Sequence, residues 1–222
     1  MISVAIDGPA GAGKSTICQE VAKALGFVHV DTGALYRAIG VYALGRGVDT
    51  ADWPGVIALL PEVEIRLQFT PQGQKIYLGD RDVTQDIRLP QASMAASNVS
   101  AIPQVREFLL DLQRDLAVRH NVVMDGRDIG TVVLPGADVK IFLTATPQVR
   151  AMRRFRELEA KGHQVSYDTL LAEVEERDYN DSHRAAAPLC QAEDAWLCDS
   201  THLTFQETVD AIIHHIKEGT GL

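Results

Sequence analysis

Short apolar runs alternate with longer amphipathic segments along the chain, and the two classes differ in length and period. Five runs have the length and the β-branched content of buried strands: 2–7, 27–31, 121–125, 137–143 and 196–199. Most segments between them place apolar residues three and four apart, as in a helix that buries one face. This alternation predicts an α/β fold, a doubly wound parallel sheet with helices on both faces.

Capping residues predict where several helices begin and end. Thr32 is expected to cap the second helix, which ends near 45–47. Thr204 and Glu207 form a capping box in front of the last helix. The remaining helices are expected at 17–25, 90–97, 103–118 and from Thr146–Pro147 onward.

Residues 62–89 change to a period of two. Apolar side chains occupy every second position of the first part, as in a half-buried strand: Val63, Ile65, Leu67 and Phe69. A turn is expected at 71–74, a second strand at 75–78 and a third at 81–84. We therefore expect a small antiparallel insert within the parallel-sheet protein. Composition does not distinguish between an insert that only fills space and one that acts as a lid.

Length and composition bound the class of protein. The 222 residues, 46% hydrophobic and 23% charged, suit a soluble globular chain with one sizeable core or a core and a small lobe. No apolar run is long enough to span a membrane, and the first strand follows Met1 directly, so no secretory or transit segment is expected. The odd set of Cys18, Cys190 and Cys198 lacks C-x-x-C spacing and predicts buried, reduced thiols of a cytosolic protein.

The charges are unevenly distributed by type. A net charge of −9 argues against wholesale binding to nucleic acid or to an anionic membrane. Yet 15 of the 21 basic residues are arginine, the side chain suited to bidentate phosphate contacts. An acidic protein with concentrated arginines is expected to hold a small phosphorylated ligand in a cleft.

The first strand leads directly into a phosphate-binding motif. Residues 8–16, Gly-Pro-Ala-Gly-Ala-Gly-Lys-Ser-Thr, fit G-x-x-x-x-G-K-[ST]. Glycines let successive N–H groups point at phosphate oxygens, and the helix that follows adds its N-terminal partial charge. Lys14 can reach the β- and γ-phosphates, and the Ser15 hydroxyl can ligate Mg²⁺. The flanking strand and helix favour a triphosphate site over a chance glycine-rich turn.

Two further strand ends carry polar side chains. Thr32, Tyr36 and Arg37 follow the strand at 27–31, at the edge where open α/β sheets bind ligands. Alone, Tyr36 would be expected to pack in the core and Arg37 to be solvated; together they favour a phosphate-acceptor pocket. Asp125 ends another buried strand, a position from which many P-loop proteins hold Mg²⁺ directly or through water.

Arginines gather on two predicted helical segments late in the chain. Spacings of three and four residues place them on shared faces: Arg150, Arg153 and Arg154, then Arg177, Asp181 and Arg184. Basic faces are usually solvated. Here two such segments follow one another, joined by 162–163, and we expect them to cover bound phosphates.

Three functional classes fit a P-loop protein of this size. They are a kinase of a small acceptor, a GTPase switch and a mechanical or nucleic-acid-linked ATPase. No Asn-Lys-x-Asp sequence is present to recognise guanine, which lowers the second class, and the negative net charge lowers the third. A kinase of a small acceptor is favoured.

Four blocks resemble the bacterial cytidylate kinase family: residues 8–14, 31–37, 125–131 and 176–189. The resemblance extends from Ile2 to the C-terminal helix and includes the antiparallel insert, which the shorter adenylate and eukaryotic UMP-CMP kinases lack. It implies that the chain is a single kinase domain. The sequence offers no obvious hydrophobic interface stripe, so we expect this domain to be a monomer, and the cysteines indicate a cytoplasmic one. The implied parts are a core (1–61, 101–146 and 190–222), a nucleoside-monophosphate-binding insert (62–100) and a lid (147–189).

The resemblance also implies an activity, the in-line transfer of the γ-phosphoryl group of ATP to CMP or dCMP. Mg²⁺ is the implied cofactor, and small nucleotides, without nucleic acid or membrane, are the implied partners. The runner-up among enzymes is a UMP-, AMP- or shikimate-type kinase. Outside enzymes it is a protein that senses nucleotides without catalysis.

Site residues follow from the same resemblance. The expected catalytic residues are Lys14, Arg127, Arg153, Arg154 and Arg177. ATP is expected to contact Gly8, Pro9, Ala10, Gly11, Ala12, Gly13, Lys14, Ser15, Thr16 and Arg156. CMP is expected to contact Thr32, Tyr36, Arg37, Ser97, Arg106, Arg127, Asp128, Asp181 and Arg184. Mg²⁺ is expected at Ser15 and Asp125, directly or through water. Ser15 stands where the family often has Gly or Ser, and Thr32 where it often has Ser.

Overall fold

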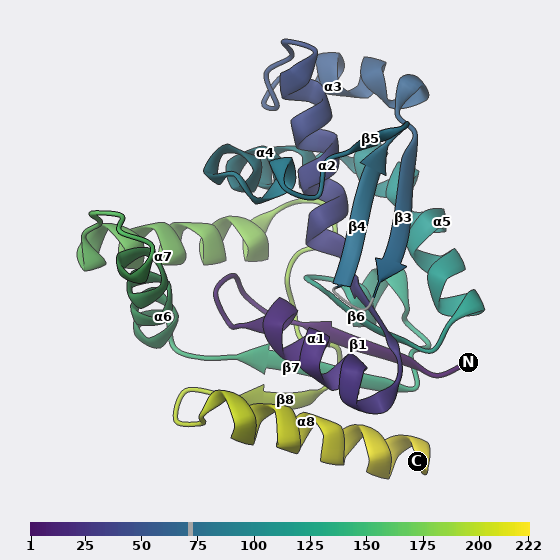
Figure 1. The fold of residues 1–222 in the computed structure, drawn as a ribbon, viewed down its shortest axis with the longest axis vertical. Coiled ribbons are helices and arrows are strands. Elements are labelled where there is room, and N and C mark those ends of the chain that lie inside the picture. Colours follow the sequence, from purple (N-terminus) through teal and green to yellow (C-terminus); the bar gives the residue numbers. More distant parts are fainter. Residues whose placement is uncertain (71–72) are drawn as a thin grey trace.

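A computed structural model describes residues 1–70 and 73–222 and has a five-stranded parallel sheet at its centre (Figure 1). The strands, in spatial order, are β2 (Val28–Asp31), β6 (Val122–Gly126), β1 (Ser3–Asp7), β7 (Val139–Thr144) and β8 (Trp196–Asp199). β1 is central and pairs in parallel with β6 on one side and β7 on the other. The chain therefore leaves β1 at the switch point of the sheet, where open α/β folds bind ligands.

Helices cover both faces of this sheet, as the sequence predicts. They are α1 (Lys14–Leu25) and α8 (Phe205–Thr220) on one face, and α5 (Pro103–Arg119) with a π-helical turn, η3 (Ile129–Val133), on the other. Ala5 and Ile6 are neighbours on β1 and are buried against opposite faces. Burial on both sides explains why the strands are continuous apolar runs and not alternating ones.

A second core lies beside the parallel sheet, in the upper part of Figure 1. It is built from α2 (Thr32–Gly45), α3 (Trp53–Leu59), η1 (Leu60–Glu62), β3 (Ile65–Thr70), β4 (Gly73–Leu78), β5 (Arg81–Asp82), η2 (Asp86–Arg88) and α4 (Pro90–Ser100). The antiparallel order β3-β4-β5 and the two-residue period are confirmed, since Ile65 and Leu67 pack on the core while Arg66 is exposed. Of the turn predicted at 71–74, Pro71 and Gln72 lie outside the described residues, and the prediction is wrong for Gly73 and Gln74, which pair with Thr70 and Phe69 as the start of β4.

Two helices form a hairpin at the side of the molecule (Figure 1). They are α6 (Pro147–Ala160) and α7 (Tyr167–His183). Thr146 caps α6, accepting from the Val149 N–H at 3.4 Å, and Thr204 and Glu207 form a capping box on α8; both caps are as predicted. Among the described residues, no helix is both long and apolar enough to cross a membrane.

Three further local expectations are wrong. Asp31, not Thr32, caps α2: its carboxylate accepts from the Ala34 N–H at 3.0 Å, while the Thr32 hydroxyl donates to the Asp125 carbonyl at 2.8 Å. The helix predicted at 90–97 continues to Ser100, because the burial of Val99 in the second core and the Asn98–Thr50 hydrogen bond at 2.9 Å outweigh the poor helix propensity of these residues. Cys18 and Cys198 are buried, but Cys190 is exposed because it lies in the irregular segment between α7 and β8.

Helices α2 and α4 come into close contact at Gly40. A Cβ atom built on Gly40 would lie 2.6 Å from the Ala95 Cβ and 3.1 Å from the Ala95 carbonyl carbon. Real Cβ atoms do not approach so closely, so glycine sets the spacing of the two helices. That spacing matters for function because α2 carries Tyr36 and Arg37 and α4 carries Ser97.

We expect Gly40→Ala to lower the free energy of unfolding by about 1–3 kcal/mol, because the added methyl group forces α2 and α4 apart. Gly45→Ala on the same helix is the matched control, since a Cβ there meets no atom within 4 Å. It should be neutral or slightly stabilising. Urea unfolding followed by circular dichroism measures both variants, and equal stabilities would contradict the packing argument.

Candidate active site

A cavity of about 620 Å³ opens where the phosphate-binding loop, the two cores and the α6–α7 hairpin converge. Its walls carry nine Lys and Arg side chains against five Asp and Glu. The protein as a whole has a net charge of −9, so this local excess of cations is the reverse of the average surface. A low-dielectric cavity with this balance attracts an anionic ligand.

Most residues expected at the site line this one cavity: Ala10, Gly11, Gly13, Lys14, Ser15, Thr16, Thr32, Tyr36, Arg37, Ser97, Arg106, Asp125, Arg127, Asp128, Arg154, Arg177, Asp181 and Arg184. Gly8, Pro9 and Ala12 are buried in the turn of the loop behind its lining. Arg153 and Arg156 are not among the lining residues. Arg153 instead donates to the Ser200 carbonyl at 2.8 Å, and Arg156 is exposed on α6.

The phosphate-binding loop follows a path that requires glycine. A Cβ on Gly8 would lie 2.0 Å from the Leu143 carbonyl oxygen on β7, and Gly11 and Gly13 have φ values of 75° and 87°. The loop ends in the first turn of α1, so its N–H groups and the helix N-terminus face the cavity together.

Lys14 is folded back on this loop. Its Nζ donates to the Gly8 and Pro9 carbonyls at 2.7 and 2.8 Å. Burial, and next the charge of Arg127, lower the pKa of the Lys14 ammonium to about 7. An anion bound in the cavity would supply the negative countercharge that the Lys14 ammonium does not find in the free protein.

Ser15 and Asp125 are suited to a hard divalent cation. Both line the cavity, Ser15 on the exposed first turn of α1 and Asp125 at the carboxyl end of β6. The Asp125 Oδ1 contacts the His29 Nε2 at 2.7 Å. No cluster of three or more His, Cys, Asp and Glu ligands exists in the described part of the chain, so a cation here would complete its shell with phosphate and water oxygens.

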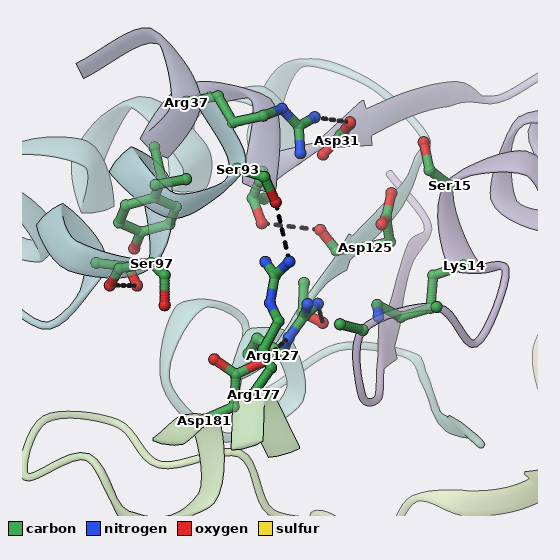
Figure 2. Close-up of a pocket in the computed structure, with 18 of the residues that line it drawn as sticks. Lys14, Ser15, Asp31, Arg37, Ser93, Ser97, Asp125, Arg127, Arg177 and Asp181 are labelled. Carbon is green, nitrogen blue, oxygen red and sulfur yellow. Dashed lines mark hydrogen bonds and ion pairs between the residues drawn. The ribbon is translucent and has the colours of Figure 1, made fainter. Parts of the chain in front are cut away.

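The corner between β2 and α2 orients Arg37 into the cavity (Figure 2). Asp31 accepts from the Arg37 Nη2 at 2.7 Å while it caps the helix. Burial acts to raise the pKa of Asp31, but the charges of Arg37 and His29 outweigh it and leave the pKa below its usual value. Asp31 therefore stays ionised and holds the guanidinium in place.

A buried acid lies between two arginines at the other end of the cavity. Asp128 is 4% exposed and forms ion pairs with Arg106 and, at 3.5 Å, with Arg184. The Arg106 guanidinium also lies 5.5 Å from the ring centre of Tyr36. Ser97 lines the same region. Carboxylate, hydroxyl and guanidinium groups fixed in one small volume can recognise the edge of a heterocyclic base.

Arg127 and Arg177 lie side by side between these two ends (Figure 2). Arg127 donates to Asp181 at 2.8 Å, and Arg177 extends from α7 to donate to the Ser93 hydroxyl at 3.0 Å. Burial, and next the charge of Arg127, lower the pKa of Arg177 to about 10. Arg177 thus faces the cavity bonded to a neutral hydroxyl, whereas Arg37 and Arg127 each bind a carboxylate.

Sequence reasoning did not assign several residues that shape the site. The clearest case is Asp7, whose carboxylate accepts from the N–H groups of Ile129 (2.8 Å) and Gly130 (2.7 Å) and so fixes the segment that follows Asp128. Burial raises the pKa of Asp7 to about 6, despite those two hydrogen bonds. In the sequence, an acid at the end of an apolar strand is the signal for a residue that holds the site, and Asp7 occupies such a position.

Comparisons with known proteins agree with this geometry. The family profile described as "Cytidylate kinase" matches residues 4–218. Cytidylate kinase of Caldicellulosiruptor saccharolyticus is 50% identical over 212 residues, which is 96% of this chain and 94% of that protein. Cytidylate kinase of Carboxydothermus hydrogenoformans is 50% identical over 213 residues, 96% of each chain.

A solved structure supports the fold alone. A gluconokinase of Sinorhizobium meliloti superposes with a TM-score of 0.50 at 16% identity, covering 98% of this chain and 92% of that one. The profile match over nearly the whole length and the identity to full-length relatives carry more weight than this likeness. The chain belongs to the cytidylate kinase family.

Proposed function

We propose that this protein transfers the γ-phosphoryl group of ATP to CMP or dCMP, giving ADP and CDP or dCDP, as a monomer in the cytoplasm. The observation that carries the proposal is one cationic cavity with a phosphate-binding loop at one end and the Asp128 cluster at the other. This arrangement suits two anionic nucleotides whose phosphates meet in the middle. Membership of the cytidylate kinase family favours this reaction over a UMP, AMP or shikimate acceptor.

Base recognition is assigned to Ser97, Arg106 and Asp128. A carboxylate can accept a hydrogen bond from the exocyclic amine of cytosine, whereas uracil presents a carbonyl at that position and is repelled. Arg106 and Arg184 hold the carboxylate in place through ion pairs. Asp181 is assigned to the ribose, and Thr32, Tyr36, Arg37 and Arg127 to the acceptor phosphate.

Phosphoryl transfer needs no strong base in this site, because the acceptor phosphate is already anionic near neutral pH. Its oxygen attacks the γ-phosphorus in line and displaces ADP directly. The protein aligns the two phosphates and neutralises charge on the transferring group through Lys14, Arg177 and the hairpin residue Arg154. When bound, Mg²⁺ would be held by Ser15 and Asp125 and would neutralise charge on the donor phosphates.

The predicted parts of the domain suit this reaction. We assign the core to ATP, the 62–100 insert with its flanking helices to the acceptor, and the 147–189 segment to a lid that excludes water during transfer. Arg153 and Arg156 lie outside the cavity lining, so the catalytic role predicted for Arg153 and the ATP contact predicted for Arg156 both require a side-chain rearrangement on α6 when nucleotides bind.

The experiment that tests the function is a coupled ADP-release assay with ATP and Mg²⁺. The acceptors are CMP, dCMP, UMP, AMP and shikimate. We expect strong turnover with CMP and dCMP, weak turnover with UMP and none with AMP. Turnover with another acceptor would support a kinase but contradict the assignment of Ser97, Arg106 and Asp128 to cytosine recognition. ATP binding without turnover on any acceptor would favour a nucleotide sensor.

Asp128→Asn is expected to reduce the preference for CMP over UMP, measured as the ratio of kcat/KM values, by about tenfold or more. An amide can rotate its NH₂ group toward the uracil carbonyl, which the carboxylate cannot do. Glu107→Gln is the matched control, because Glu107 is an exposed acid next to Arg106 on α5. An unchanged ratio in Asp128→Asn would remove Asp128 from base recognition.

ATP binding is expected to take up protons at Lys14. In the free protein the pKa of Lys14 is about 7, so at pH 8 most of these side chains are neutral. Bound phosphates raise this pKa, and binding at pH 8 should therefore take up close to one proton, with about half of that at pH 7. Calorimetry of ATP binding in two buffers of different ionisation enthalpy measures the uptake. Lys14→Met should abolish it; binding without uptake at pH 8 in the unmodified protein would contradict the prediction.

A further inference from the structure

Arg150 is the most deeply buried charged side chain of the α6–α7 hairpin, and the proposed chemistry gives it no role. It lies on the first turn of α6 and is 2% exposed. Its Nε donates to the Ala145 carbonyl at 2.8 Å, and its Nη1 donates to the Ala10 carbonyl at 2.8 Å. Both terminal nitrogens also bond the Asp178 carboxylate, with Nη1 to Oδ1 at 2.9 Å.

These contacts join three separate elements through one guanidinium. Ala10 belongs to the phosphate-binding loop, Arg150 begins α6, and Asp178 lies on α7. The planar fork of arginine has enough donors to bind a carboxylate bidentately and still reach a carbonyl. A lysine in the same place would have a single nitrogen and could not bridge both partners with fixed geometry.

Asp178 sits beside the two α7 residues that enter the cavity. Arg177 precedes it and reaches Ser93, and Asp181 lies about one turn later and accepts from Arg127. The position of α7 relative to the phosphate-binding loop therefore decides where the Arg177 guanidinium stands relative to bound phosphates. Arg150 links the two, because its guanidinium binds both the Asp178 carboxylate on α7 and the Ala10 carbonyl in the loop.

We propose that Arg150 and Asp178 are positioning residues, which hold α7 in register with the phosphate-binding loop so that Arg177 reaches the transferring phosphoryl group. The inference rests on the proposed function for the identity of the reaction. A buried ion pair is weak evidence for added stability, but its fixed geometry suits it to orienting neighbours. A role through Arg177 and a role in stability alone make different predictions.

The test is a double-mutant cycle of Asp178→Asn and Arg177→Ala, read as kcat and KM. If Asp178 acts by placing Arg177, Asp178→Asn lowers kcat by about tenfold to a hundredfold and leaves KM for CMP within about twofold. In the Arg177→Ala background the same substitution then costs little further activity. Losses that multiply in the double variant, or full kcat in Asp178→Asn, would overturn the inference.

Glu176→Gln is the matched control, an exposed acid on the same helix, and should leave kcat unchanged. Asp178→Glu keeps the charge and should recover part of the loss, whereas Arg150→Lys should behave like Asp178→Asn. Arg150→Lys and Asp178→Asn retain polar side chains, and thermal unfolding identifies a variant that has lost its fold. For such a variant the cycle is run with Asp178→Glu instead.

A second measurement separates this inference from the proposed function. Amide hydrogen exchange of α7 in the free protein needs no acceptor and no turnover. Asp178→Asn should speed exchange over Tyr167–His183, and Glu176→Gln should not. Faster exchange in a protein that does not phosphorylate CMP would count against the proposed reaction and keep the tie between α7 and the loop. Unchanged exchange in Asp178→Asn would overturn the tie itself.

Discussion

Mutual repulsion among the cations of the cavity is the constraint on which the site depends. Nine Lys and Arg side chains line one space of about 620 Å³. Without compensation, burial of so many like charges would oppose folding strongly. Most of these arginines form an ion pair with a carboxylate. The pairs are Arg37 with Asp31, Arg106 and Arg184 with Asp128, Arg127 with Asp181, and Arg150 with Asp178.

The exceptions to this pairing are informative. Lys14 bonds backbone carbonyls, and Arg177 bonds the Ser93 hydroxyl. Both groups therefore have neutral partners where the other arginines have carboxylates, and burial and the nearby charge of Arg127 lower the pKa of both. Added negative charge is stabilised most beside the least compensated cations. The middle of the cavity, between Lys14 and Arg177, is therefore where we expect the phosphate of the proposed transfer to be stabilised most.

Much of the fold could be predicted because it depends on local patterns. Continuous apolar runs identify the parallel strands, a two-residue period identifies the antiparallel sheet, and Thr146 and Thr204 identify two helix starts. Competition between neighbours was harder to predict. Asp31 and Thr32 are both good caps, and the choice depends on Asp125, a residue distant in sequence that accepts the Thr32 hydroxyl. The 53–59 helix has too short a pattern to be recognised.

The same limit applies to the arginines. Spacing places Arg150, Arg153 and Arg154 on related faces of α6, but it does not say which of them is buried. Only the packing of α6 against the phosphate-binding loop and α7 shows that Arg150 is enclosed while Arg154 pairs with Glu173 at the surface. The role of a residue such as Arg150, which contacts three elements, cannot be assigned from the spacing of residues along one helix.

The two sides of the cavity are held by different forces, and this difference suits a two-substrate reaction. The insert is not a loose cover: Ile76 is fully buried in the second core, and the Gln74 side chain bonds both the N–H and the carbonyl of Asp31, at 3.0 and 3.3 Å. Apolar packing of this kind keeps the proposed acceptor side of the cavity in one shape. Apart from the buried Arg150 contacts, the hairpin meets the other walls of the cavity through the Arg127–Asp181 ion pair and the Arg177–Ser93 hydrogen bond, which bound phosphate can replace. Rearrangement on nucleotide binding is thus expected where α7 meets Arg127 and Ser93, beside the proposed acceptor pocket, while the Arg150 contacts persist.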